Sequence, residues 1–270
     1  MKRSILHLVG HLATAPARRS FAAHARARTV SFCSADGVRL SAWLLEPDDA
    51  RGTLVLAHGY RDDRRQLLSP LQDALIAHRV RALAIDFRAH GESEGRFVTI
   101  GHDEAQDVVA SLARAEELAG PVGYLGFSMG AAAYLLARRE ADFAILDSPY
   151  DTLREAIFAR TDRFWVPRRL AESITHLRPD LGFPAIDASR PIDGARDLSS
   201  PTLFVFAPGD PWIPSATRER FRAAMSPRCR VELLPRGGHD DHFSPAWVDR
   251  VMSFVDEQLR RIAEEASPRR

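Results

Sequence analysis

The sequence predicts an α/β fold in which helices cover both faces of a mostly parallel β-sheet. Composition gives the first reason: the 270 residues are 45% hydrophobic and 27% charged, near the average for a globular protein. The second is a series of short apolar runs rich in Val, Leu, Ile and Phe, as strands buried on both faces require. The third is that longer helical patterns separate most of these runs, which is typical of parallel pairing.

The individual elements follow from local patterns. Residues 29–33 and 38–46 are expected to form an antiparallel pair, because Asp36-Gly37 between them is a strong turn signal. Buried strands are expected at 53–57, 80–85, 122–127, 143–146, 202–206 and 230–234. Helices are expected at 66–78, 102–119, 129–139, 215–225 and 245–262.

One interval between two consecutive predicted strands is longer than a single crossover helix requires. Between the strands at 143–146 and 202–206 lie helical patterns at 152–165 and 167–177, then a loop over 178–199 with three prolines. We interpret residues 149–201 as a small helical cap inserted into a core made of residues 29–148 and 202–270.

Charge and cysteine content exclude other classes of function. The 37 basic and 36 acidic residues nearly cancel, so no global field favours nucleic acid as a partner. Cys33 and Cys229 are too far apart in the sequence to suggest a disulfide framework. Met1 to Ala17 loosely resembles a secretory signal, but His7 and His11 interrupt its apolar run. We expect a cytoplasmic protein, with membrane association as the alternative, rather than a secreted one.

Residues 1–28 form a basic segment ahead of the first acidic residue, Asp36. Two interpretations stay open: a flexible tail, or an amphipathic helix with an apolar face around residues 5–12 that makes weak peripheral contact with a membrane. On either interpretation, deletion of residues 2–28 is expected to affect surface association before it affects catalysis.

The pentapeptide Gly126-Phe127-Ser128-Met129-Gly130 follows a predicted strand and opens a predicted helix. The pattern G-x-S-x-G at such a junction predicts a sharp, strained turn with small residues two positions to either side of the serine. Ser128 would then project above the sheet next to a helix N-terminus, as a nucleophile requires.

A serine nucleophile needs a histidine and an orienting carboxylate, expected later in the chain. Asp210 follows the strand at 202–206, and His239 follows the strand at 230–234. Asp210 would hold one imidazole nitrogen of His239, and the other nitrogen would accept the Ser128 proton. Asp147 is the alternative acid and His242 the alternative base.

Acyl chemistry also needs hydrogen-bond donors where charge develops on the carbonyl oxygen. The backbone N–H of Met129 is one candidate for this oxyanion hole. The backbone N–H of Tyr60 is the other, because Gly59 lets the chain turn after the strand at 53–57. His58 is interpreted as a brace for this loop rather than as a base.

With these motifs in place, the sequence resembles the α/β-hydrolase superfamily, in the branch of serine aminopeptidase-like hydrolases and cap-bearing esterases and lipases. The resemblance runs from about Val38 to Leu259 and rests on His58-Gly59-Tyr60, on the segment from Asp86 to Ser93, on the turn at Ser128 and on the loops at Asp210 and His239. Ala89 stands where the family most often has glycine. The resemblance implies an eight-stranded sheet whose catalytic loops gather at the carboxyl ends of the strands.

No metal or cofactor is expected. His239-Asp-Asp-His242 has no further ligand group at metal-like spacing, and no G-x-G-x-x-G follows a strand. A serine at the turn also disfavours the dehalogenases and epoxide hydrolases of the superfamily, which use aspartate there.

The expected substrate is a carboxylic ester with a small to medium acyl chain, cleaved through an acyl-enzyme. Phe164 and Trp165 of the cap, together with Trp212, are the candidate substrate contacts. An acyltransferase, a thioesterase and a peptidase could use the same triad, and a noncatalytic binding protein is the alternative outside enzymology.

Overall fold

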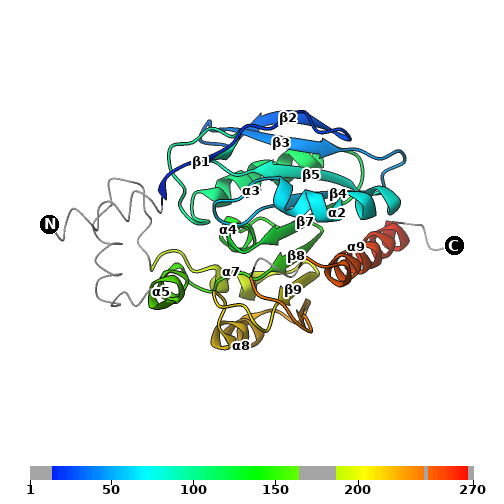
Figure 1. The fold of residues 1–270 in the computed structure, drawn as a ribbon. Helices are drawn as coiled ribbons and strands as arrows, with labels where there is room; N and C mark the ends of the chain where they lie inside the picture. The colour runs from blue at the N-terminus through cyan, green and yellow to red at the C-terminus, as the bar shows by residue number, and fades with distance from the viewer. Residues whose placement is uncertain (1–13, 164–186, 240–242, 267–270) are drawn as a thin grey trace.

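An eight-stranded sheet forms the centre of the computed structural model, which describes residues 14–163, 187–239 and 243–266 (Figure 1). From one edge to the other the strands run in the order β10-β9-β8-β7-β4-β5-β3-β2. Their bounds are β2 (Ala27–Cys33), β3 (Arg39–Leu45), β4 (Thr53–Ala57), β5 (Arg81–Asp86), β7 (Val122–Phe127), β8 (Phe143–Asp147), β9 (Thr202–Phe206) and β10 (Cys229–Leu233).

Most of the sheet is parallel, as the alternating pattern predicts. β3 pairs antiparallel with β2 and with β5, whereas the pairs from β5 across β4, β7, β8 and β9 to β10 are all parallel. The carboxyl ends of these parallel strands therefore meet at one edge. The prediction of a mostly parallel, eight-stranded sheet is confirmed.

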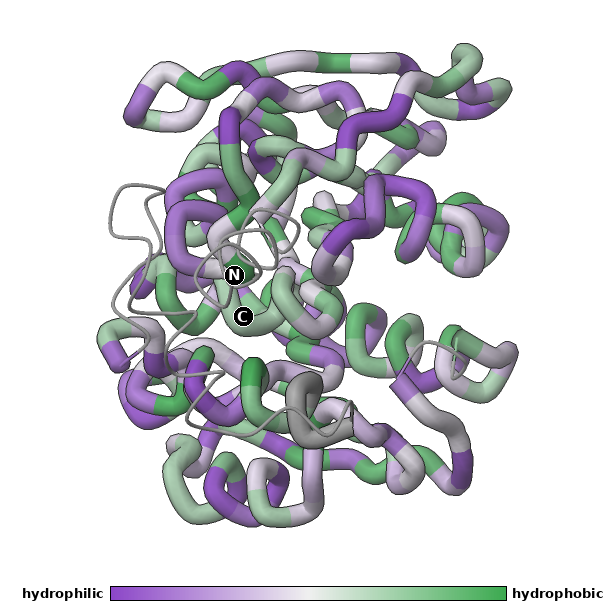
Figure 2. The backbone as a smooth tube through the Cα atoms, turned by 60° about the vertical axis from the view of Figure 1, so that its left-hand side comes forward, coloured by the Kyte–Doolittle hydropathy of each residue, from purple (hydrophilic) through white to green (hydrophobic). Residues whose placement is uncertain are grey.

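Helices cover both faces, and the strand residues alternate between them. Val55 and Ala57 of β4 face one apolar cluster, while Leu54 and Leu56 face the other, as the two-residue period of a strand requires. The first cluster is covered by α3 (Glu104–Glu116), α4 (Met129–Ala137), α7 (Pro191–Asp197) and α8 (Ser215–Ala224), and the second by α2 (Arg65–Ala77) and α9 (Pro245–Ala266). Hydrophobic and hydrophilic residues alternate along α2, α3, α8 and α9 (Figure 2), the pattern of helices that bury one face. In contrast, α4 is apolar along its length and almost wholly buried.

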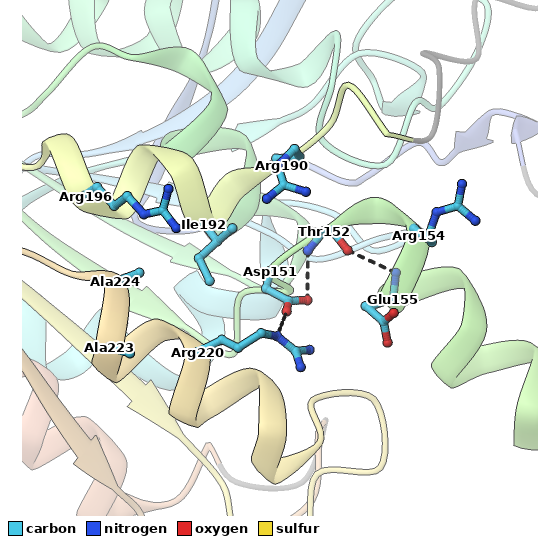
Figure 3. Close-up of a pocket in the computed structure, with 10 residues that line it drawn as sticks. All are labelled: Asp151, Thr152, Arg154, Glu155, Arg190, Ile192, Arg196, Arg220, Ala223 and Ala224. Atoms are coloured by element: carbon cyan, nitrogen blue, oxygen red, sulfur yellow. Dashed lines mark hydrogen bonds and ion pairs between the residues drawn. The ribbon is translucent and has the colours of Figure 1, made fainter.

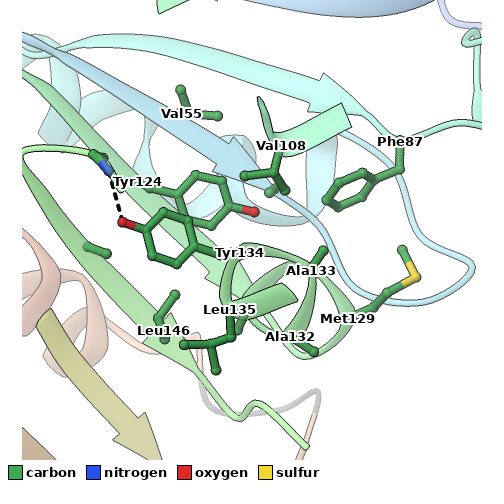
Figure 4. Packing of buried hydrophobic residues seen from close by; sticks show 14 of the residues in the cluster. Val55, Phe87, Val108, Tyr124, Met129, Ala132, Ala133, Tyr134, Leu135 and Leu146 are labelled. Atoms are coloured by element: carbon green, nitrogen blue, oxygen red, sulfur yellow. Dashed lines mark hydrogen bonds between the residues drawn. The ribbon is translucent and has the colours of Figure 1, made fainter. Parts of the chain in front are cut away.

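Within the first cluster, α4 packs on β7. Tyr124 of β7 stacks on Tyr134 of α4 with ring centroids 4.5 Å apart. Ala132 and Ala133 of α4 are fully buried beside them (Figure 4). These small side chains let the helix lie close to the sheet, and the start of α4 is thereby fixed above the carboxyl end of β7.

The prediction of a loop over residues 178–199 is wrong in its last part, where the structure has the helix α7. Pro191 begins this helix, and a proline at that position gives up no helical hydrogen bond. A Cβ atom on Gly194 would lie 2.2 Å from the carbonyl oxygen of Leu135 in α4. Ile192 and Ala195 belong to the first apolar cluster, so this end of the predicted cap is part of the core helix layer.

The first part of the predicted cap is a helix, α5 (Leu153–Arg163). The second predicted cap helix, at 167–177, lies outside the described residues. Cap boundaries at 149 and 201 therefore stay a prediction, except that α7 packs with the core.

The basic N-terminal segment differs from both of its predicted forms over residues 15–28. Ala17–Arg18 form a short strand, β1, that pairs in parallel with β6 (His90–Gly91), and Ala27 already begins β2. Its arginines pair with acidic side chains, as in Arg19–Asp63, Arg26–Asp73 and Arg28–Glu46. The expected apolar face at residues 5–12 lies outside the described part of the chain. No helix among the described residues is long and apolar enough to cross a membrane.

Candidate active site

Ser128 lies in a strained turn between β7 and α4. Its φ of 51° and ψ of −107° are unfavourable for a residue with a side chain. A Cβ on Gly130 would lie 2.3 Å from the carbonyl oxygen of Ala57, and one on Gly126 would lie 2.7 Å from the backbone nitrogen of Ala131. Both glycines of the motif are therefore sterically required, as the sequence pattern predicts.

The structure brings Ser128, His239 and Asp210 into one hydrogen-bonded chain. His239 Nε2 lies 2.9 Å from Ser128 Oγ, and His239 Nδ1 lies 2.7 Å from Asp210 Oδ2. The three residues follow β7, β10 and β9, whose carboxyl ends lie at the same edge of the sheet. Each is at most 7% exposed, so the contacts are shielded from water.

The hydrogen bonds along this chain determine which nitrogen of neutral His239 carries the proton. Asp210 Oδ1 accepts the backbone N–H groups of Trp212 and Ile213, at 2.8 and 3.1 Å. The ionised carboxylate offers only acceptors, so the proton of neutral His239 sits on Nδ1 and points to Asp210. The lone pair of Nε2 then faces Ser128 Oγ, the arrangement that a general base requires.

The alternative acid does not occupy this position. Asp147 is fully buried, and its two oxygens accept hydrogen bonds from Trp247 Nε1 at 2.7 Å and Ser148 Oγ at 2.9 Å. It therefore fixes α9 against β8, and Asp210 is the carboxylate at His239. His242 lies outside the described residues.

A small cavity of about 200 Å³ opens beside Ser128. Its wall contains the predicted residues Tyr60 and Trp212 together with residues that the motifs did not indicate; the full lining is Gly59, Tyr60, Asp62, Gln66, Phe127, Ser128, Trp212 and His239. Met129, the other oxyanion candidate, directly follows Ser128 as the first residue of α4. Phe164 and Trp165 lie outside the described residues.

Asp62 and Gln66 are the cavity residues that sequence reasoning missed. Gln66 Oε1 accepts the backbone N–H of Gly59 at 2.7 Å, which ties the loop after β4 to the first turn of α2. Gln66 stood at the predicted start of a helix, and Asp62 in a polar stretch before it. Neither position carries a spacing that indicates a site.

His58 braces the same loop from the other side, in agreement with the sequence-based interpretation. Its Nδ1–H donates to the Gly59 carbonyl at 2.7 Å, and its Nε2 accepts the Phe87 N–H at 3.1 Å. Burial, with a smaller contribution from nearby His90, lowers the pKa of His58 to about 3. The ring is therefore neutral and structural, and both of its nitrogens are occupied.

A second hollow of about 770 Å³ lies between α5, α7 and α8 (Figure 3). Four arginines border it, and each pairs with a carboxylate: Arg154 with Asp187, Arg190 and Arg196 with Asp193, and Arg220 with buried Asp151. None of the predicted site residues lines this hollow. Arg220 links α8 to the segment before α5, and Arg154 links α5 to the segment before α7. The two pairs with Asp193 lie within α7 and its N-cap.

The fold and the turn at Ser128 define the class of protein. Residues 54–251 match the alpha/beta hydrolase family, and the chain belongs to that family. Comparison with curated proteins found no significant match.

Solved structures of similar fold include enzymes with different substrates. An esterase from Pyrococcus furiosus is 22% identical with a TM-score of 0.68, over 87% of this chain and 91% of that one. An esterase from Exiguobacterium antarcticum is 16% identical with a TM-score of 0.62, over 86% and 99%. A proline iminopeptidase from Mycobacterium smegmatis is 13% identical with a TM-score of 0.63, over 87% and 100%. At these identities the likeness concerns the fold.

Proposed function

We propose that the protein is a serine hydrolase that cleaves carboxylic esters with small to medium acyl chains. The hydrogen-bonded chain from Ser128 through His239 to Asp210 carries this proposal. Such a chain converts a hydroxyl that is a weak nucleophile at neutral pH into one that attacks an acyl carbon.

In the proposed reaction, Ser128 Oγ attacks the ester carbonyl while His239 Nε2 takes its proton. The negative charge on the carbonyl oxygen is stabilised by the backbone N–H groups of Met129 and Tyr60, from α4 and the loop after β4. His239 then gives the proton to the leaving alcohol, and Ser128 carries the acyl group as an ester. Water, activated by His239, releases the acid and restores the serine.

Two observations support an ester with a modest acyl chain. The cavity beside Ser128 has a volume of about 200 Å³, which suits a small group better than a long chain. Two of the similar structures are named esterases. The same machinery serves amides and thioesters, and the proline iminopeptidase among the similar structures makes a prolyl amide the appropriate competing substrate.

A fluorophosphonate probe tests the proposed nucleophile. We expect the wild-type protein to be labelled and Ser128→Ala to remain unlabelled. We also expect this variant to lose at least ~10³-fold in ester turnover while its melting temperature stays close to wild type. A wild-type protein that the probe does not label would instead support a noncatalytic binding protein.

A panel of p-nitrophenyl esters from two to twelve acyl carbons, with proline p-nitroanilide as the competing amide, tests the substrate class. We expect kcat/KM to be highest for short and medium esters. Higher kcat/KM for the anilide than for every ester would assign a peptidase. Accumulation of a new ester on addition of an alcohol would assign an acyltransferase.

A further inference from the structure

Residues 15–21, named here the N-terminal strap, lie across the loop that follows β5. The Ala17 N–H donates to the Ala89 carbonyl at 2.7 Å, and the Arg19 N–H donates to the Gly91 carbonyl at 2.9 Å. The Arg18 guanidinium adds bonds to the carbonyls of Ser93 and Gly95 at 3.1 and 2.8 Å. The strap is therefore held by backbone pairing, independently of its side-chain contacts with the loop after β4.

One strap side chain reaches the loop that carries Tyr60. Arg19 Nη1 lies 2.6 Å from Asp63 Oδ2, and Arg19 Nη2 donates to the Arg61 carbonyl at 3.4 Å. The Asp63 side chain is fully buried and also accepts the Arg65 backbone N–H at 3.0 Å. Burial alone would raise the pKa of Asp63, but the hydrogen bonds from Arg65 and Arg19 outweigh it and hold the pKa well below its usual value. Asp63 is thus a fixed negative anchor three residues after Tyr60.

A second strap side chain, Phe21, packs against Arg64, the residue that follows Asp63. The Arg64 guanidinium is 5.1 Å from the ring centroids of both Phe21, in the strap, and Trp43, in β3. Its Nε donates to Asp86 Oδ2 at 2.9 Å, while its Nη1 has no hydrogen-bond partner within the described part of the chain. The aromatic faces provide favourable surroundings for that charge. Phe21 therefore completes the site that holds the start of α2.

The loop after β4 is thus fixed at both ends. His58 and Gln66 hold its start at Gly59. The strap holds its end at Asp63 and Arg64 together with the Arg65 side chain, which also pairs with Asp63, and Asp86, which pairs with Arg64. Between these points lies Tyr60, whose backbone N–H is assigned to the oxyanion hole. A displacement of about 1 Å at such a donor is enough to weaken catalysis strongly.

We propose that Arg19 is a positioning residue for the oxyanion hole, acting through Asp63 on the loop that presents Tyr60. This inference rests on the proposed function. It also reverses the sequence-based expectation for residues 2–28, because loss of the strap is now expected to impair turnover of a dissolved ester directly.

Arg26 provides a matched control for Arg19. Both arginines belong to the N-terminal segment, both are about half exposed, and both form an ion pair, at 2.6 Å for Arg19–Asp63 and 2.7 Å for Arg26–Asp73. Asp63 is fully buried in the loop, whereas the Asp73 side chain is 81% exposed on α2. Arg19→Ala and Arg26→Ala therefore each remove one guanidinium in an ion pair. Only Arg19→Ala removes a contact with the loop that carries Tyr60.

We expect Arg19→Ala to lower kcat for a p-nitrophenyl ester about 10- to 100-fold with KM within about 3-fold. Removal of an oxyanion donor costs ~10²- to 10³-fold, and a loosened donor should cost less. Binding of a boronic acid, which forms a tetrahedral adduct at the serine, should weaken in parallel with kcat/KM. Arg26→Ala should match wild type in all three measurements, and Arg19→Lys should recover most of the kcat.

Hydrogen exchange and melting temperature separate positioning from general stability. Amides of residues 59–63 should exchange faster in Arg19→Ala than in Arg26→Ala, with both variants still folded at the assay temperature. Equal kcat and equal exchange in the two alanine variants of an active enzyme would overturn the positioning role. A wild-type protein without fluorophosphonate labelling would overturn the proposed function, and the oxyanion role of the strap with it.

Discussion

Asp210 and Asp147 both follow strands that end at the catalytic edge of the sheet, but their hydrogen-bond partners differ. Asp210 Oδ1 holds two backbone N–H groups, and Oδ2 faces His239 Nδ1. In Asp210→Asn the single amide oxygen should keep the two backbone donors, so the amide N–H₂ turns toward His239. The histidine proton then moves to Nε2, which can no longer accept the proton of Ser128.

We therefore expect Asp210→Asn to reduce kcat by up to ~10⁴-fold, the magnitude known for the corresponding change in a serine protease. Asp147→Asn is the control, because an amide can still accept from Trp247 Nε1 and donate to Ser148 Oγ. Its kcat should stay within about 3-fold of wild type. Steady-state kinetics of both variants on one p-nitrophenyl ester make the comparison, and the reverse ranking would move the acid role to Asp147.

Among individual residues of the candidate site, the sequence predicted those that belong to a recognisable motif and missed those that do not. Ser128, Asp210 and His239 each follow an apolar strand pattern, so chain order alone indicated a common edge. Asp62 and Gln66 line the same cavity without any periodicity. The pair Arg19–Asp63 joins residues 44 positions apart, a separation that no local pattern records.

Among the helices and strands, α7 shows where prediction from sequence patterns fails and why. Its region was predicted as a loop because prolines break helices, yet Pro191 occupies the first helical position, where proline is favoured. The short strands β1 and β6 were missed because two residues are too few for a period-two pattern. Long elements with regular apolar spacing were predicted closely: the helix expected at 66–78 is α2 at Arg65–Ala77.

The contact between α7 and α4 leads to a stability prediction. Gly194→Ala would place a methyl group 2.2 Å from a backbone oxygen of α4, and neither helix can move without disturbing the core. Overpacking costs ~1–3 kcal/mol, which exceeds the gain of at most ~1 kcal/mol in helix propensity. We expect a net loss in the urea-derived free energy of unfolding. Ser253→Ala, at an exposed position of α9, should change it by less than about 0.5 kcal/mol; equal effects would mean that α7 is not packed as described.

For the molecule as a whole, buried His58 links folding to pH. In the folded protein the pKa of His58 is about 3, whereas in the unfolded chain it is about 6.5. As pH falls from 7 to 5, the unfolded chain gains a proton that the folded protein does not bind, so stability decreases. This one group accounts for a loss of about 2 kcal/mol over that range.

We expect His58→Gln to show a smaller loss of stability between pH 7 and pH 5 than wild type, although it is less stable at pH 7. The other histidines are present in both proteins, so the difference between the two slopes reports the loss of His58. Unfolding in urea at the two pH values gives the four free energies. Identical slopes would show that His58 is not buried and neutral as described.

The place of β10 at the edge of the sheet bears on the order in which the protein becomes active during synthesis. β10 pairs only with β9 among the described strands, and His239 follows it 111 residues after Ser128. Ribosomes add ~5–20 residues per second, so the nucleophile precedes its base by several seconds. On the proposed function, the growing chain holds Ser128 throughout that interval without the histidine that would deprotonate it. The proposed base is added only after β10, the last described strand, and we expect unfinished chains to be inactive toward esters.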